Sequence, residues 1–263
     1  MNPPNIEILP TNDGSVTLYL TGMEETYHSR HGAMRESMHV YVRSGVVDVL
    51  ISLGFLEGEL LLVRKKESLQ VFEMGFGTGL NAWLLDEFCR SIGLNYSYVG
   101  IEKYPLPKEF SEIVDFGFGA MGVHWRSVNR GLGDGIFNDG KGETYRERWK
   151  QLFDSSYTEA IGTNATNENT ILKVEGDVLV DLERVMPMQT SLVFWDAFAP
   201  KKQPELWTTE LFTRVRARMR EGGMLVTYTA NSQVRRNMLA AGFRVDRIAG
   251  PPQKKHMLRA WKD

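Results

Sequence analysis

The sequence is poor in cysteine and lacks a long uninterrupted hydrophobic run. Cys89 is the single cysteine among 263 residues, which excludes an intramolecular disulfide framework and a metal site built from several cysteines. The most apolar stretch, residues 46–63, is interrupted by Asp48, Glu57 and Glu59, so we do not expect it to span a bilayer. Because no basic region followed by an apolar core opens the sequence, we expect a cytoplasmic protein without a membrane segment.

Metal-binding patterns are scarce as well. His31, Glu36 and His39 are near one another in the sequence. Neither they nor any other set of His, Asp and Glu has the spacing of a metal site. We therefore predict no metal.

Charge is unevenly distributed, although the formal net charge is only −2. Residues 214–259 contain eleven Lys and Arg residues against Glu221 and Asp246, a local charge of +9 that leaves −11 for the remainder. Such an asymmetry is typical of proteins with a polyanionic partner. On charge alone, an ordinary solvated surface remains the alternative.

Alternating strand and helix patterns begin at residue 70 and predict a parallel sheet with helices on both faces. The last two expected strands are joined by only seven residues, too few for a crossover helix, so they should pair as an antiparallel hairpin. The apolar stretch at 37–56 has no clean period, and no element is assigned there. The expected strands are 6–9 and 16–20 (a hairpin), 70–74, 96–102, 171–175, 191–196, 224–229, 243–248 and 256–261; the expected helices are 80–92, most of 111–153 apart from a glycine-rich loop at 131–142, 178–185, 205–220 and 235–241, with a further loop at 163–170.

A glycine loop follows the strand at residues 70–74. Its glycines fall at 75, 77 and 79, where they let the backbone approach a ligand closely, and the following helix offers free N–H groups. The dinucleotide fingerprint G-x-G-x-x-G requires glycine at the position of Leu80, and the phosphate-binding loop G-x-x-x-x-G-K-[ST] does not occur. The pattern E-x-G-x-G-x-G resembles instead motif I of class I S-adenosylmethionine-dependent methyltransferases.

This resemblance implies the cofactor S-adenosyl-L-methionine and an α/β, Rossmann-like fold. The fold would have a mostly parallel seven-stranded sheet with an antiparallel C-terminal hairpin, here preceded by a small N-terminal β extension. Glu102, at a strand end, would accept hydrogen bonds from the ribose hydroxyls. Asp177 would accept from the adenine amino group, cap the helix that follows it, or do both. The cofactor-binding residues implied are Glu73, Gly75, Phe76, Gly77, Thr78, Gly79, Asn81, Glu102, Lys103, Asp177, Asp196 and Phe198.

Asp196 ends the strand expected at 191–196, at the edge of an open α/β sheet where ligands bind. The segment Asp196-Ala197-Phe198-Ala199-Pro200 resembles in part the amine-methylating motif of class I enzymes, in which an acidic or amide group and an aromatic ring hold the target nitrogen. A primary alkyl amine is mostly protonated near neutral pH. As the catalytic residue, Asp196 would accept an N–H bond, orient the lone pair and help a proton leave.

A narrower resemblance rests on several segments that occur in a fixed order. These are 75–81 (GFGTGLN), 102–106 (EKYPL), 196–200 (DAFAP), 234–236 (VRR), 241–243 (AGF) and 254–258 (KKHML), with residues 27–37 as a further match. Together they resemble the methyltransferase half of the bifunctional tRNA wobble-uridine enzymes of the MnmC family, a half that also occurs alone as MnmD. The resemblance covers most of residues 25–261.

The family implies methylation of the exocyclic amine of 5-aminomethyl-2-thiouridine in the tRNA anticodon stem-loop. No second glycine fingerprint occurs, so we expect no flavin domain and an amine supplied by another enzyme. The base would leave its stack to reach the pocket. Tyr27, Glu36, Phe198 and Trp207 are the pocket candidates, and for Phe198 and Trp207 core packing is the alternative. The residues proposed to hold tRNA phosphates are Lys201, Arg235, Arg236, Lys254 and Lys255.

Other function classes stay open. One is a class I methyltransferase of a small-molecule amine, and another is a non-catalytic tRNA-binding module. A nicotinamide oxidoreductase is disfavoured by Leu80 and by the expected C-terminal hairpin. We expect two parts, an N-terminal hairpin and pocket-covering segment at 1–60 and a methyltransferase domain at 61–263.

Overall fold

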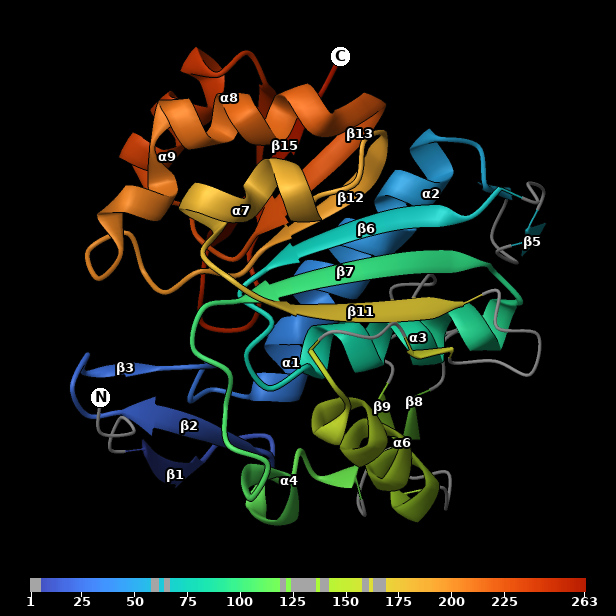
Figure 1. Cartoon of the computed structure of the whole chain (residues 1–263), viewed down its shortest axis with the longest axis vertical. Coiled ribbons are helices and arrows are strands. Elements are labelled where there is room, and N and C mark those ends of the chain that lie inside the picture. Colours follow the sequence, from blue (N-terminus) through green and yellow to red (C-terminus); the bar gives the residue numbers. More distant parts are fainter. Residues whose placement is uncertain are drawn as a thin grey trace.

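A central sheet organises the chain (Figure 1). The computed structural model describes residues 6–57, 62–63, 67–118, 122–123, 136–137, 142–157, 161–162 and 169–263. From one edge to the other the strands are β10 (Ile161–Gly162), β11 (Thr170–Glu175), β7 (Tyr96–Glu102), β6 (Leu69–Met74), β12 (Thr190–Trp195), β13 (Met219–Thr227), β15 (His256–Trp261) and β14 (Arg244–Ala249).

The directions of these strands agree with the predicted class. β11, β7, β6, β12 and β13 pair in parallel, and β15 runs antiparallel to both β13 and β14. The mostly parallel seven-stranded sheet with an antiparallel C-terminal hairpin is therefore confirmed. The two-residue strand β10 adds an antiparallel extension at one edge.

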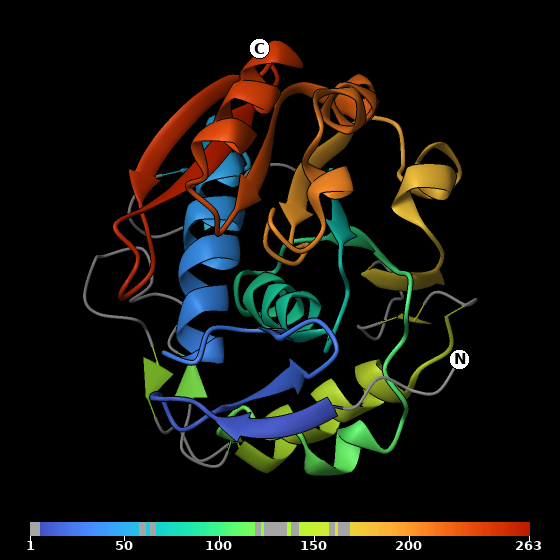
Figure 2. The same cartoon turned by 90° about the vertical axis from the view of Figure 1, so that its left-hand side faces the viewer.

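Helices bury both faces of the sheet, because alternate side chains along a strand point to opposite faces. Along β12, Phe194 belongs to the hydrophobic cluster on one face, while Val193 and Trp195 belong to the cluster on the other. Figure 2 shows the two helical layers on either side of the sheet. The first layer contains a helical segment at residues 33–52 and α3 (Leu80–Ile92), and the second contains α7 (Val178–Val185), α8 (Thr209–Arg218) and α9 (Ser232–Ala240).

The apolar stretch without a clean period forms one continuous helical segment that the sequence analysis did not predict. It consists of α1 (Ala33–Ser37), the π-helical η1 (Met38–Val47) and α2 (Asp48–Ser52). A π-helix closes its hydrogen bonds from i to i+5, so its side chains do not follow the 3.6-residue period of an α-helix. The helix is also buried on most sides, and the residues between 33 and 50 that are not buried are Arg35, Glu36, His39, Arg43 and Asp48.

A small N-terminal sheet precedes this helix. Its strands are β1 (Ile6–Pro10), β2 (Val16–Leu20) and β3 (Glu25–Thr26), so the predicted hairpin is confirmed and β3 is an addition. Leu18 is fully buried in the same cluster as the helix that follows. The division of the chain at residue 60 stays a prediction.

Three other element predictions require correction. In the described part of 111–153, helix is limited to α4 (Phe110–Ile113, which begins one residue earlier) and α6 (Gly142–Asp154), with short strands β8 (Gly122–Val123) and β9 (Ile136–Phe137). The helix expected at 205–220 is divided into the 3-10 turn η3 (Pro204–Trp207) and α8, because the Thr208 side chain caps α8 by accepting from the Leu211 amide. The glycine pair at 222–223 lies inside β13 rather than between helix and strand.

The remaining short elements complete the description. β4 (Leu56–Glu57) and β5 (Leu62–Val63) form a separate antiparallel pair. Most of the loop expected at 163–170 lies outside the described residues. No helix in the described part of the chain is both long enough and apolar enough to cross a membrane.

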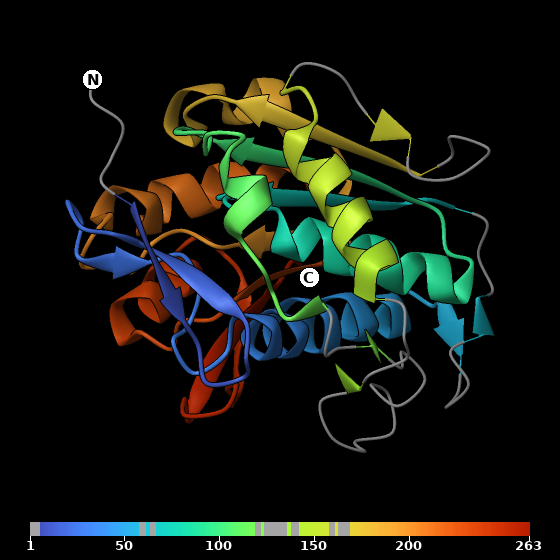
Figure 3. The ribbon, with the colours of Figure 1, turned by 90° about the horizontal axis from the view of Figure 1, so that it is seen from below.

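Helix α6 is fastened across α3 by buried polar contacts, and Figure 3 shows it lying beneath α3 beside α4. Arg148 forms a bidentate ion pair with Glu87, whose side chain is only 6% exposed. The Trp149 indole nitrogen donates to the carbonyl oxygen of Thr78 at 3.0 Å, and Lys173 Nζ donates to the Phe153 carbonyl oxygen at 2.7 Å. These contacts attach α6 to the glycine loop as well as to α3.

We predict that Arg148→Met lowers the free energy of unfolding by about 2–3 kcal/mol. A buried carboxylate that loses its partner costs about 3–5 kcal/mol, and Arg148 is partly screened because its side chain is 31% exposed. Burial already raises the pKa of Glu87 while Arg148 opposes the rise, so the deficit should shrink at pH 5 as Glu87 takes up a proton.

Urea denaturation at pH 8 and pH 5 measures both effects. Arg184→Met is the matched control, because Arg184 pairs with Asp181 on the exposed side of α7 and such pairs contribute about 0–1 kcal/mol. Equal losses in the two variants would contradict the assigned role of the Arg148 pair.

Candidate active site

The glycine loop after β6 has the backbone geometry that only glycine adopts readily. Gly75, Gly77 and Gly79 have φ values of +88°, +53° and +71°, in the region that L side chains rarely occupy. A Cβ on Gly75 would lie 2.5 Å from the backbone oxygen of Asp196. The loop therefore passes directly against the end of β12, and this close approach brings the carboxyl ends of β6 and β12 together at one site.

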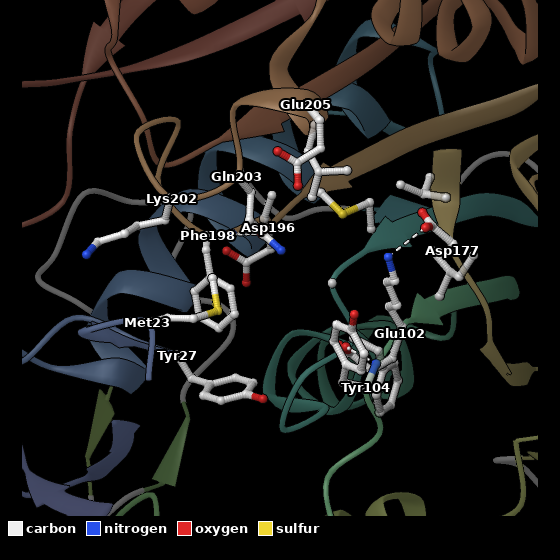
Figure 4. Close-up of a pocket in the computed structure, with 18 of the residues that line it drawn as sticks. Met23, Tyr27, Glu102, Tyr104, Asp177, Asp196, Phe198, Lys202, Gln203 and Glu205 are labelled. Atoms are coloured by element: carbon white, nitrogen blue, oxygen red, sulfur yellow. Dashed lines mark hydrogen bonds and ion pairs between the residues drawn. The ribbon is translucent and has the colours of Figure 1, made fainter. Parts of the chain in front are cut away.

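A cavity of about 510 Å³ opens at this edge of the sheet (Figure 4). One side of it is formed by the glycine loop and by the carboxyl ends of β7 and β11. The opposite side is formed by the N-terminal sheet and by the loop after β12. Carboxylates line it at Glu102, Asp177 and Asp196, and aromatic rings line it at Tyr27 and Phe198. This volume and mixed lining are typical of a small-molecule site.

Glu102 is held in place by the backbone. One of its oxygens accepts from the Gly77 amide at 3.0 Å and the other from the Tyr104 amide at 2.9 Å. Burial raises the pKa of Glu102, and these hydrogen bonds oppose the rise. Each carboxylate oxygen has a second lone pair, so the fixed Glu102 remains able to accept from a pair of ligand hydroxyls.

Asp177 both caps a helix and forms an ion pair. Its side chain accepts from the Leu179 amide at 2.9 Å. Asp177 is therefore the N-cap of α7, as one of the sequence-based interpretations predicted. Its other oxygen lies 2.8 Å from Lys103 Nζ. Burial works against ionisation, but the hydrogen bond from Lys103 prevails and lowers the pKa of Asp177. Both Lys103 and Asp177 line the cavity, and Figure 4 shows Asp177 on the same side as Glu102.

Asp196 is the end point of a buried polar chain. Asn81 Nδ2 donates to Asp196 Oδ2 at 2.8 Å and to Glu73 Oε1 at 2.8 Å, and the Tyr98 hydroxyl donates to the other oxygen of Glu73. Burial raises the pKa of Asp196 to about 7, although interactions with Tyr41 and Asn81 oppose the shift. The carboxylate form of Asp196 is therefore substantially populated only from neutral pH upward.

Glu73 and Asn81 are placed differently from the sequence prediction. Both were expected to touch the cofactor, but neither lines the cavity, and Glu73 is fully buried. Burial and the nearby Asp196 raise the pKa of Glu73 well above its usual range. The two residues lie behind Asp196 and hold its carboxylate in one orientation.

Thr78 and Phe76 also serve the shape of the loop. The Thr78 hydroxyl lies 2.8 Å from His28 Nε2 and only 1% of the residue is exposed, so it connects the loop to the N-terminal segment rather than facing the cavity. Phe76 lines the cavity, and its ring packs against Gly100. A Cβ on Gly100 would lie only 2.4 Å from that ring. Gly100 thus shapes the site from within β7, although no sequence pattern singles it out.

Two of the expected substrate residues form the aromatic wall. Tyr27 and Phe198 pack edge to face with ring centroids 5.3 Å apart, and both face the cavity in Figure 4. For Trp207 the structure favours the core-packing alternative over stacking on a base. Trp207 is 2% exposed, and its indole nitrogen donates to the Phe198 carbonyl oxygen at 3.1 Å, so it supports the wall from the core.

The predicted phosphate-binding residues divide into two groups. Lys201, Arg235, Arg236 and Lys255 are exposed. Lys254 is not: it pairs with Glu36 at 2.5 Å. Lys202, which the prediction omitted, lines the cavity instead of its neighbour Lys201.

The charge excess of residues 214–259 is partly neutralised by acidic residues elsewhere in the chain. Five of its basic residues form ion pairs outside that segment, and they are Arg214 with Glu183, Arg220 with Glu67, Arg244 with Asp263, Lys254 with Glu36 and Arg259 with Asp48. The local charge of +9 therefore overstates what this segment offers to a polyanion.

Comparison with known proteins agrees with this geometry. The family model described as S-adenosyl-L-methionine-dependent methyltransferase matches residues 143–263. The match begins in α6 and extends to the last residue, and it covers a little less than half of the chain. S-adenosyl-L-methionine fits the site, because the cradle at Gly75 admits no side chain and the carboxylates of Glu102 and Asp177 suit the hydroxyl and amino groups of an adenosine.

The curated relatives of this chain are bifunctional proteins. It is 28% identical over 246 residues to the tRNA 5-methylaminomethyl-2-thiouridine biosynthesis bifunctional protein MnmC of Pseudomonas aeruginosa (strain UCBPP-PA14), covering 89% of this chain and 32% of that protein. It is 27% identical to the protein of the same name from Cupriavidus metallidurans, covering 98% of this chain and 34% of that one. The chain thus spans about a third of the length of these relatives.

A solved structure shares the fold. The crystal structure of MNMC2 from Aquifex aeolicus aligns with a TM-score of 0.70 and 23% identity, covering 100% of this chain and 72% of that one. The alignment extends over the N-terminal sheet and the helical segment as well as the central sheet.

We predict that Gly75→Ala weakens S-adenosyl-L-methionine binding at least about tenfold. Both the positive φ of Gly75 and the 2.5 Å approach to the Asp196 backbone forbid a methyl group without movement of the loop. Gly93→Ala is the matched control, because Gly93 has φ +71° but no atom within 4 Å of the added Cβ. The control should lose about 1 kcal/mol of stability from backbone strain and keep its affinity, and calorimetric titration separates the two. An unchanged Kd in Gly75→Ala would show that the loop does not cradle the cofactor.

Proposed function

We propose that this chain transfers a methyl group from S-adenosyl-L-methionine to the primary amine of 5-aminomethyl-2-thiouridine at the tRNA wobble position. The product would be 5-methylaminomethyl-2-thiouridine, the nucleoside that appears in the names of its curated relatives. The observation that carries the proposal is the position of Asp196, a half-buried carboxylate between the glycine loop and the aromatic wall of Tyr27 and Phe198.

The cofactor half of the cavity is assigned to residues at the ends of β6, β7 and β11. Glu102 would accept from the ribose hydroxyls and Asp177 from the adenine amino group, while the Gly75 backbone lies against the methionine portion. When bound there, the cofactor supplies a methyl group on a sulfonium. Phe76 gives the floor of this half an apolar surface.

The substrate half is assigned to Asp196 and the wall. A primary ammonium has no free lone pair, and its ordinary pKa is near 10. The Asp196 carboxylate accepts an N–H bond from the amine, orients the lone pair toward the cofactor half and receives a proton. With a pKa of about 7, Asp196 is a stronger base than an exposed aspartate, which suits general base catalysis near neutral pH.

The tRNA itself would lie across the cavity mouth. Aromatic faces are common acceptors for a base that has left its stack, and Phe198 and Tyr27 offer them. Exposed basic residues, namely Lys201, Arg235, Arg236 and Lys255, would contact phosphates. Because tRNA is the substrate in this proposal, we place the protein in the cytoplasm.

The function is tested by methyl transfer to tRNA. We predict that labelled methyl from S-adenosyl-L-methionine enters tRNA from cells that lack this gene, and that nucleoside analysis finds it in 5-methylaminomethyl-2-thiouridine.

Asp196→Asn should keep cofactor affinity but lose turnover by about 10²–10⁴-fold, as expected for loss of a general base. The wild-type rate should rise with pH through a midpoint near 7 and level above it, because the carboxylate form is required.

Asp181→Asn serves as the matched control, since Asp181 lies in α7 and pairs with Arg184. Wild-type turnover in Asp196→Asn would remove the assigned role of Asp196. Cofactor binding without label in any tRNA, together with turnover on a polyamine, would move the substrate to the class of small-molecule amines.

We further predict that Arg235→Glu and Lys255→Glu each raise the KM for tRNA and reduce the slope of log KM against log salt by about 1. Each lost phosphate contact releases about one counterion fewer. Arg244→Glu is the control, because Arg244 begins β14 and so lies at the edge of the sheet opposite the cavity. The measurement is the salt dependence of KM with anticodon stem-loop RNA. If all three variants gave the same slope, the assignment of this basic surface to phosphate binding would be refuted.

A further inference from the structure

Glu36 and Lys254 form an ion pair between parts of the chain that are far apart in sequence. Glu36 lies in α1, and Lys254 lies in the turn between β14 and β15. Their charged atoms are 2.5 Å apart, and the side chain of Glu36 is only 12% exposed. The second oxygen of Glu36 accepts from the Ser29 amide at 2.9 Å. The pair thus connects the N-terminal segment that carries Tyr27 to the C-terminal hairpin.

The same pair reaches the loop that carries Asp196. Lys254 Nζ lies 4.6 Å from the centre of the Tyr228 ring, within the range of a cation–π contact. The Tyr228 hydroxyl donates to the carbonyl oxygen of Ala197 at 2.9 Å. Because Ala197 directly follows Asp196, a short series of contacts leads from the ion pair to the backbone of the reacting carboxylate.

Electrostatic contact supplements this mechanical connection. Asp196 interacts electrostatically with polar and ionisable groups on the elements that surround it. These groups are Tyr41 in η1, Glu73 in β6, Asn81 in α3, Tyr98 in β7, Tyr228 after β13, Glu36 in α1 and Lys254 in the hairpin turn. Two of them carry charges of opposite sign in one ion pair. Glu36 raises the pKa of Asp196 and Lys254 lowers it, so each compensates for the other.

We propose that the Glu36–Lys254 ion pair is a positioning device for Asp196, which braces the Asp196–Ala197 backbone through Tyr228 and keeps the charge beside the carboxyl group balanced. Lys254 is then a positioning residue rather than a ligand of tRNA phosphate. The functional consequence rests on the proposed methyl transfer, but the placement and charge of Asp196 do not.

The charge balance predicts opposite effects for the two partners. Glu36→Gln leaves Lys254 uncompensated, so the pKa of Asp196 should fall by about half a unit or more. Lys254→Met leaves Glu36 uncompensated, so the pKa should rise by a similar amount. The double variant should return close to the wild-type value, and Lys254→Arg, which keeps the charge, should do the same.

The test is a titration of the aspartate carboxyl carbons by NMR in protein labelled at those carbons, without cofactor or tRNA. The Asp196 signal is assigned by its absence in Asp196→Asn. Arg244→Met is the matched control, because it removes a positive charge from an ion pair on the same hairpin at the opposite edge of the sheet. Thermal melting identifies any variant that fails to fold; if Lys254→Met does so, Lys254→Gln, which also removes the charge, replaces it and should shift the pKa in the same direction.

The pH dependence of methyl transfer under single-turnover conditions provides the functional readout. The pH midpoint of the acidic limb of the rate profile should move to lower pH in Glu36→Gln and to higher pH in Lys254→Met. Each shift should equal the shift in the pKa of Asp196 found by titration. Shifts of the same sign in both variants, or no shift, would overturn the proposal. A raised KM for tRNA in Lys254→Met, with an unmoved acidic limb and titration, would make Lys254 a phosphate ligand. If the wild type transfers no methyl to tRNA, the proposed function fails, while the titration still decides the inference.

Discussion

The contact between the glycine loop and the end of β12 is the constraint on which the site depends. Gly75 approaches the Asp196 backbone so closely that no side chain fits between them, and this fixes the distance between the loop that we assign to the cofactor and the carboxylate that we assign to the reaction. Parallel pairing of β6 with β12 and β7 delivers both segments to the same edge. The N-terminal sheet and α6 then pack against the loop, through His28 and Trp149 respectively.

A second constraint is the burial of polar groups behind this contact. Glu73 has no exposure, and only its hydrogen bonds with Asn81 and Tyr98 make that burial tolerable. Because Asn81 donates to both carboxyl groups, the orientation of Asp196 is linked to the packing of β6, β7 and α3. Rigid elements, rather than loops alone, therefore hold the catalytic geometry.

The sequence allowed the sheet, its C-terminal hairpin and the glycine loop to be predicted, because each has a local signature. The helical segment at 33–52 could not be, since a π-helix buried on most sides has no 3.6-residue period. Trp207 and Lys254 were candidates for substrate binding because the sequence alone does not distinguish aromatic and basic residues that bind substrate from those that pack or form ion pairs. The burial of Trp207 and the ion pair of Lys254 with Glu36, which is 218 residues away in the sequence, arise only once the chain has folded. Gly100 had no signal at all, because its role is to leave room for Phe76.

The raised pKa of Asp196 also has a thermodynamic consequence. Its folded pKa of about 7 lies above the ordinary aspartate value of 3.8. Between these two pH values the folded state keeps a proton that the unfolded state has lost, so the stability contributed by this group falls as pH rises from about 4 to 7. The loss is complete only above that folded pKa, in the range where the methyl transfer proposed for this site would use the carboxylate form. Hydrogen bonds from Tyr41 and Asn81 oppose the rise in the pKa of Asp196 and so limit that cost, whereas Glu36 and Lys254 act in opposite directions and offset each other. The polar structure around Asp196 therefore moderates the shift without removing the basicity that the proposed reaction would use.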